Sequence, residues 1–144
     1  MTFGRNEILA GVAVLAVAML IVVPVVLSSN RHSRREEVPR LVEAIRQAEI
    51  TYHDAFSDFV SAEAAPRPGH AVGPEPVAWV PSEGFRKLSW SPDVESVYGS
   101  YQVQALPKGF KVVGSCDVDG DGDRAVFEAT LEEPAHAVTA ADVY

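Results

Sequence analysis

The chain has 144 residues and a formal net charge of −8 at pH 7, a length that suits one small domain. The acidic balance argues against a nucleic-acid partner, because such partners are bound by basic patches. The single cysteine, Cys116, excludes an intrachain disulfide and a zinc site built from several cysteines.

The first predicted element is an apolar segment near the start of the chain. No charged residue occurs from Ile8 to Leu27, and about 20 apolar residues are enough to cross a bilayer as a helix. One alternative is a buried core helix, which is rarely apolar on every side. The other is a cleaved secretory signal, whose apolar region is usually shorter. We therefore predict a transmembrane helix within an N-terminal segment comprising residues 1–30.

A second helical pattern follows, in which apolar residues recur at steps of three and four. It predicts an amphipathic continuation over residues 31–63, so that one helix runs from about Asn6 to Ala62. Pro24 and Pro39 each remove a backbone donor, and each predicts a bend or local melting. Glu49 is among the polar residues placed off the apolar face. That face comprises Val38, Leu41, Val42, Ile45, Ala48, Tyr52, Phe56, Phe59 and Val60.

Residues 64–144 are predicted to form a proline-rich loop followed by a globular β-sheet domain. Prolines and glycines are too dense between Ala64 and Pro81 for a regular element. Period-two patterns then predict an antiparallel sheet, and the fold class is α+β, with a long N-terminal helix packed on that sheet. Residues 134–144 fit no pattern. The predicted strands are Val97–Leu106, Phe110–Cys116 and Ala125–Leu131.

The order of these elements resembles that of a type IV pilin, or of a type II secretion pseudopilin, of the deltaproteobacterial type. Glu7 precedes the apolar run and Pro24 lies seventeen residues later, as in pilins. The stretch 36–52 is similar to the amphipathic half of pilin helices, and the stretches 85–101 and 117–127 are similar to their sheet regions. The resemblance covers most of the chain and implies a structural subunit of a pilus-like filament or pseudopilus, not an enzyme.

The resemblance implies roles in assembly for three N-terminal residues. It implies that Glu7 sets the register of assembly by pairing with the N-terminal amine of a neighbouring subunit, with Phe3 and Pro24 in the same assembly helix. The alternative for Glu7 is a solvated interfacial residue beside Arg5. Phe3 aligns with the residue after the prepilin cleavage point, but Thr2 stands where a glycine precedes that point in prepilins. We therefore expect the N-terminus not to be processed in the usual way.

The resemblance also implies partners and a location. The partners are copies of the chain or other pilin subunits, met through the N-terminal helix, together with the inner membrane and the pilus or type II secretion assembly machinery. The domain would be periplasmic before assembly and part of a cell-surface filament after it. The positive-inside rule points the other way, because Arg5 alone precedes the anchor. The arginines just after it are Arg31, Arg34, Arg35 and Arg40.

An aspartate-rich stretch near the end of the chain predicts a calcium site. It fits the pattern D-x-D-x-D-G-x5-E, in which oxygen ligands two residues apart converge on one ion. Strands are predicted on both sides of it, so we expect a strand–loop–strand site and not an EF-hand. The alternative is an acidic, glycine-rich turn without metal. The predicted ligands are Asp117, Asp119, Asp121, Asp123 and Glu128.

Two other functions remain open from the sequence. One is a single-pass membrane protein that does not assemble and whose extracytoplasmic domain is stabilised by calcium. The other is a membrane-anchored enzyme, which would need convergent titratable groups. The histidines have neither metal-site nor catalytic-triad spacing; they are His32, His53, His70 and His136.

Overall fold

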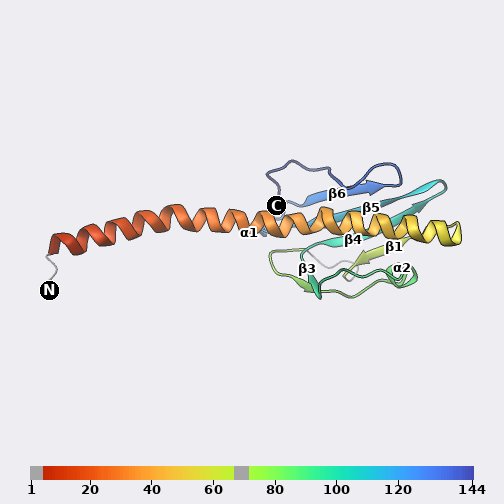
Figure 1. Cartoon of the computed structure of the whole chain (residues 1–144), viewed down its shortest axis with the longest axis horizontal. Helices are drawn as coiled ribbons and strands as arrows, with labels where there is room; N and C mark the ends of the chain where they lie inside the picture. Colours follow the sequence, from red (N-terminus) through yellow and green to blue (C-terminus); the bar gives the residue numbers. More distant parts are fainter. Residues whose placement is uncertain (1–4, 67–71) are drawn as a thin grey trace.

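One long helix dominates the architecture, and a small antiparallel sheet packs along its second half (Figure 1). The computed structural model of the chain describes residues 5–66 and 72–144, with side chains from Ser29 onward. Helix α1 (Arg5–Phe56) has 52 residues, and at about 1.5 Å per residue it is about 78 Å long. Its first half extends away from the sheet (Figure 1). The predicted α+β class, a helix on an antiparallel sheet, is confirmed.

The main sheet has five strands in the order β1-β4-β5-β6-β7, all paired antiparallel. Its centre is the β4–β5–β6 meander, which confirms the predicted strands Phe110–Cys116 and Ala125–Leu131 closely. The predicted strand Val97–Leu106 is confirmed only from Ser100, because Val97 belongs to β3 of a second sheet. A separate two-stranded sheet pairs β2 with β3, and a short helix, α2, lies between these two strands in the chain. The sequence patterns did not predict β1, β2, α2 or β7, each of which has two to five residues. The bounds are β1 Ala62–Ala65, β2 Val77–Ala78, α2 Glu83–Lys87, β3 Ser96–Val97, β4 Ser100–Leu106, β5 Gly109–Cys116, β6 Ala125–Thr130 and β7 His136–Ala137.

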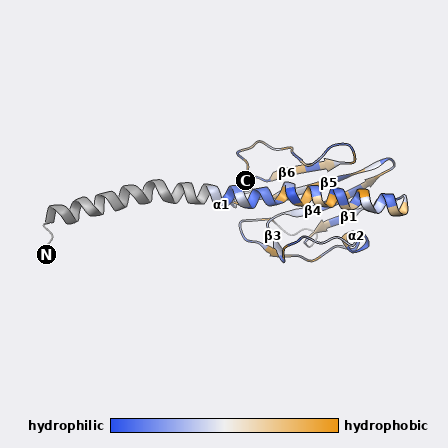
Figure 2. Ribbon diagram, viewed as in Figure 1, coloured by the Kyte–Doolittle hydropathy of each residue, from blue (hydrophilic) through white to orange (hydrophobic). Residues whose placement is uncertain are grey.

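The core lies between α1 and one face of the sheet. Along the part of α1 beside the sheet, apolar and polar residues alternate in the way expected of an amphipathic helix (Figure 2). The helix crosses β5 at Gly114, where an added Cβ would lie 2.5 Å from Val42 and 2.8 Å from Val38. The absence of a side chain at this position therefore allows the close approach. Within residues 29–56 of α1, the fully buried apolar residues are Val38, Leu41, Val42 and Ile45, all on the predicted face.

The predicted end of the helix is wrong by six residues. The helix ends at Phe56 and not at Ala62 because Ser57 adopts a left-handed conformation (φ 56°), which commonly terminates helices. Phe56, predicted to lie on the core face, is 65% exposed. Glu49, predicted to lie off that face, is fully buried. The chain turns back sharply here, so the last turn of the helix has less of the domain to pack against.

The prediction of one continuous helix is confirmed, since α1 is helical at both Pro24 and Pro39. Neither proline melts it locally, and Figure 1 shows a gentle curve in its first half. From Ser29 onward, where the structure describes side chains as well as backbone, no helix is both long enough and apolar enough to cross a membrane.

Several N-terminal predictions concern residues that the structure does not describe in full. Phe3 lies outside the described residues. For Glu7, Pro24 and the apolar run Ile8–Leu27, the structure gives the helical backbone, and their side chains lie outside the described part. The predicted membrane span and the assembly roles therefore stay predictions.

Candidate metal centre and helix–sheet contacts

The candidate metal centre is the loop between β5 and β6. Cys116 pairs with Ala125 at the last register of the two strands, and the loop closes between them. Gly120 and Gly122 both have positive φ, 74° and 93°, a conformation that glycine adopts without the steric penalty of a side chain. The glycines thus let a short acidic segment curl back on itself.

Three of the five predicted ligands come together in this loop. Carboxylate oxygens of Asp117, Asp119 and Asp121 all lie within 4.8 Å of one another. Asp117 is buried and shapes the loop: Oδ1 accepts a hydrogen bond from the Gly120 amide (2.8 Å) and Oδ2 one from the Gly122 amide (3.2 Å). Asp121 Oδ1 accepts one from the Asp123 amide at 2.8 Å.

Asp119 is the least satisfied member of this cluster. Its Oδ2 lies 3.9 Å from Nη1 of Arg31 on α1, and its side chain is only 16% exposed. Its Oδ1 is buried and has no hydrogen-bond partner within residues 5–66 and 72–144. A buried carboxylate oxygen without a donor is unfavourable, so this atom offers a free ligand position on a residue of the cluster.

The other two predicted ligands lie apart from the cluster. Asp123 is exposed, and none of its carboxylate atoms belongs to the group of three. Glu128 lies within β6, opposite Val113, three residues beyond the pair that closes the loop, which is about 10 Å at the rise of a strand. Its Oε1 lies 2.6 Å from Nζ of Lys111 on β5. In this arrangement Glu128 forms an ion pair between β6 and β5.

The chemistry of the cluster suits a hard divalent cation. Calcium takes six to eight oxygen ligands, so three carboxylates would need backbone carbonyls or water to complete its shell. The alternative, an acidic turn without metal, is also supported by contacts. Backbone amides already satisfy Asp117, and Arg31 partly neutralises Asp119.

The loop lies at the end of the domain where α1 enters it, as the contact with Arg31 shows. At the same end Arg34 donates a hydrogen bond to the Pro74 carbonyl (3.0 Å), and Pro74 lies against Gly120. Any cation held by the loop would therefore lie beside the start of the helix–sheet contact.

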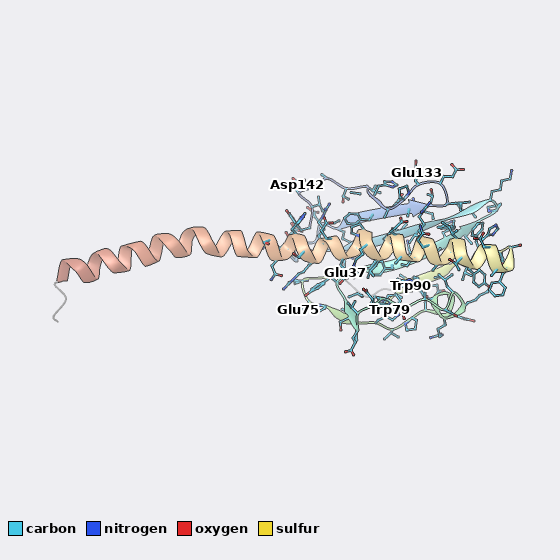
Figure 3. All side chains as sticks on the ribbon, in the orientation of Figure 1. Glu37, Glu75, Trp79, Trp90, Glu133 and Asp142 are labelled. Atoms are coloured by element: carbon cyan, nitrogen blue, oxygen red, sulfur yellow. The ribbon has the colours of Figure 1, made fainter. Side chains whose placement is uncertain are left out.

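Polar side chains of α1 hold the domain by binding its backbone. Glu37, which lies on α1 near β3 (Figure 3), accepts hydrogen bonds from the Tyr98 amide (2.9 Å) and the Tyr101 hydroxyl (3.2 Å). Burial, the charge of Glu37 and this bond raise the pKa of Tyr101 well above its usual value. Glu37 thus fixes the start of β4 to the helix.

The C-terminal segment is held to α1 by arginines. Arg35 is buried; its Nε donates to the Val143 carbonyl (2.7 Å) and its Nη2 to the Ala140 carbonyl (3.4 Å). Its guanidinium lies 4.9 Å from the centre of the Phe127 ring and 6.0 Å from that of Tyr144. Such contacts with aromatic faces add to the hydrogen bonds. The segment that fitted no sequence pattern is therefore ordered by tertiary contacts.

A second pair of contacts lies farther along α1. Arg46 donates to the carbonyls of Thr130 (2.7 Å) and Leu131 (2.9 Å), and Glu43 accepts from the Ala135 amide (3.0 Å). Sequence reasoning missed these roles, because charged residues at helical spacing are also typical of a solvated face. The only available signal was their position on both flanks of the apolar stripe.

The remaining candidate residues pack in the interior. Burial raises the pKa of the Cys116 thiol to about 12, so it is not a reactive thiolate at neutral pH. Trp79 and Trp90 lie on the same side of α1 (Figure 3), and each ring packs against Phe85 and against the other. These contacts favour packing over a ligand platform.

Comparison with known protein families, curated proteins and solved structures finds no significant match for this chain.

Proposed function

We propose that the chain is a structural subunit of a type IV pilus-like filament or secretion pseudopilus, assembled through the first half of α1. The observation that carries the proposal is the single helix Arg5–Phe56, whose second half is the packing surface of the sheet. The sequence of its first half is an uncharged apolar run preceded by Glu7. One rigid rod therefore joins the assembling segment to the displayed domain.

The contacts between α1 and the domain support this proposal. A subunit held in a filament by its helix passes any load on the domain through the helix–sheet interface. Here Glu37, Arg35 and Arg46 bind the backbone at the start of β4, at the C-terminus and after β6. Charge-assisted hydrogen bonds of this kind are about twice as strong as neutral ones.

The proposal includes a location and a cation. The domain faces the periplasm while the apolar run lies in the inner membrane, and it reaches the cell surface when the subunit assembles. Calcium bound by Asp117, Asp119 and Asp121 stabilises the loop where the domain meets the helix. Copies of the chain or other pilin subunits, and the pilus or type II secretion machinery, are its partners.

Replacing Glu7 by alanine in the native host tests the assembly role. An interhelical ion pair worth about 1.4 kcal/mol corresponds to about tenfold in incorporation into filaments, while the thermal stability of the domain should not change. Glu36→Ala, which removes an exposed carboxylate farther along the same helix, is the control and should incorporate normally. Equal incorporation of wild type and both variants would remove the case for a specific pair. A chain found only in the membrane would favour the non-assembling alternative.

A further inference from the structure

A second carboxylate environment lies at the other end of the domain, around Glu49. This residue of α1 is fully buried, although carboxylates are rarely buried without a charged partner. Its Oε2 accepts a hydrogen bond from the Val60 amide (3.1 Å). Its Oε1 is buried and has no hydrogen-bond partner in the described part of the chain. Half of the carboxyl group is therefore unsatisfied.

The bond to Val60 determines the path of the chain after α1. Ser57 ends the helix, and residues 57–61 return the chain to β1 at the edge of the main sheet. Phe59 packs against Phe110 of the core, with ring centres 5.4 Å apart. Glu49 is thus the polar contact that ties this connection, which we call the α1–β1 connection, to the helix.

The charged and titratable groups near Glu49 lie on α1, on the α1–β1 connection and on α2. Asp58 of the α1–β1 connection opposes its ionisation and Lys87 of α2 favours it. His53, one turn later on α1, stacks on Phe59 at 4.2 Å and has a buried Nδ1 with no partner among the described residues. No full counter-ion lies within 4 Å of the carboxylate in that part of the chain, so a negative charge on Glu49 would be poorly compensated.

We propose that Glu49 is a proton-dependent latch, which holds the α1–β1 connection closed when neutral and releases it when ionised. Burial is the main cause that raises the pKa of Glu49, from its usual 4.5 to about 7, against the lowering effect of the Val60 bond. The open form, in which the carboxyl reaches water, titrates near the usual value. The opening equilibrium therefore rises between pH 4.5 and pH 7 and is constant above this range. This inference does not depend on the proposed function.

Carboxyl NMR and hydrogen exchange on the full-length chain in detergent test the latch. In the ¹³C-glutamate spectrum, one carboxyl should titrate near pH 7 and be missing from Glu49→Gln. The protection of the Val60 amide, corrected for intrinsic exchange, should fall about sixtyfold from pH 5 to pH 7.5. Glu49→Gln should show no such fall, whereas Glu36→Gln, at an exposed position of the same helix, should behave as wild type.

Two results would overturn the proposal. One is a Glu49 carboxyl that titrates near 4.5 in the wild-type chain, a measurement that does not require the variant to fold. The other is a Val60 amide whose corrected protection is the same at pH 5 and pH 7.5, or falls equally in Glu49→Gln.

Discussion

The two carboxylate environments of this domain, the acidic β5–β6 loop and Glu49, are organised in opposite ways. Three aspartates, ranging from the buried Asp117 to the exposed Asp121, gather where α1 enters the domain, next to Arg31. Glu49 is alone and buried, eighteen residues farther along α1 than Arg31, which is about 27 Å of helix. A bound cation offsets the repulsion between clustered carboxylates, whereas protonation removes the unfavourable charge of an isolated buried carboxylate. We therefore expect calcium to affect the stability of one end of the domain and pH that of the other.

The largest expected effect is on the pH dependence of stability. The folded state retains the Glu49 proton up to about pH 7 and the unfolded state loses it near 4.5, so the free energy of unfolding should fall by about 3 kcal/mol as the pH rises through this window. The whole contribution is present below the window. Urea unfolding of wild type and Glu49→Gln at pH 5 and pH 7.5 isolates it, because the two chains share every other titratable group. A difference between them that does not change with pH would show that Glu49 ionises freely in the fold.

Glu43 lies about one and a half turns before Glu49 on α1, and its pKa is shifted in the opposite direction. Although burial acts to raise its pKa, hydrogen bonds from Gln47, the Ala135 amide and Arg46 outweigh it and the pKa is lowered. Its contribution to stability is therefore present above the usual carboxylate range and is lost as the pH falls into it. Glu43→Gln should leave the change between pH 5 and pH 7.5 unaltered.

Calcium should have the next largest effect on the free energy of unfolding. Binding to the folded state alone stabilises it by about 2.7 kcal/mol at a hundredfold excess over the dissociation constant, which is several degrees in melting temperature for a small domain. Thermal unfolding with calcium, magnesium or chelator measures it, and Asp119→Asn or Asp121→Asn should abolish the calcium response. Three superimposable melting curves for the wild type would mean that the loop is an acidic turn held by Arg31.

The third largest effect is expected when the contacts of Arg35 with the C-terminal segment are removed. Arg35→Met keeps the apolar stem but leaves the Val143 carbonyl without its donor and removes one of the two donors to the Ala140 carbonyl. We therefore expect a loss of about 2 kcal/mol in chemical unfolding. Arg86→Met is the control, because Arg86 donates to the Pro81 carbonyl at an exposed site. Similar losses in the two variants would show that the buried arginine has no special role.

The smallest expected effect concerns Glu128. Its pairing with Lys111 is a partly exposed contact between strands, so Glu128→Gln should change the free energy of unfolding by less than about 1 kcal/mol. The calcium response of the variant should equal that of wild type, since Glu128 lies away from the three aspartates. Loss of the calcium response in Glu128→Gln would mean that the loop rearranges around the ion to recruit it.

The parts of the fold predicted from the sequence are those with a repeated pattern. The stripe from Val38 to Ile45 and the alternation in β4, β5 and β6 each repeat several times, so local errors average out. β2 and β7 have two residues each and carry no period. The helix end at Ser57 depends on a left-handed conformation that serine rarely adopts, which no apolar pattern encodes.

The candidate site, too, was predicted from the sequence only in part. The spacing of Asp117, Asp119 and Asp121 predicts their convergence, because a tight glycine turn brings alternate residues together. Glu128 satisfies the sequence pattern, yet β6 begins at Ala125 and carries it away from the loop. Glu49 lies four residues after Ile45 and seven after Val42, a spacing that places it on the buried face of the helix. It was missed because its charge, and not its spacing, decided its assignment to the polar face.

Purifying surface filaments from the native host tests whether this chain assembles through α1 into a filament. We expect filaments in the electron microscope whose mass spectrum contains this chain, and few or no filaments when Glu7 is replaced by alanine. Filaments that lack the chain altogether, with all of it recovered as monomers in the membrane, would contradict the account.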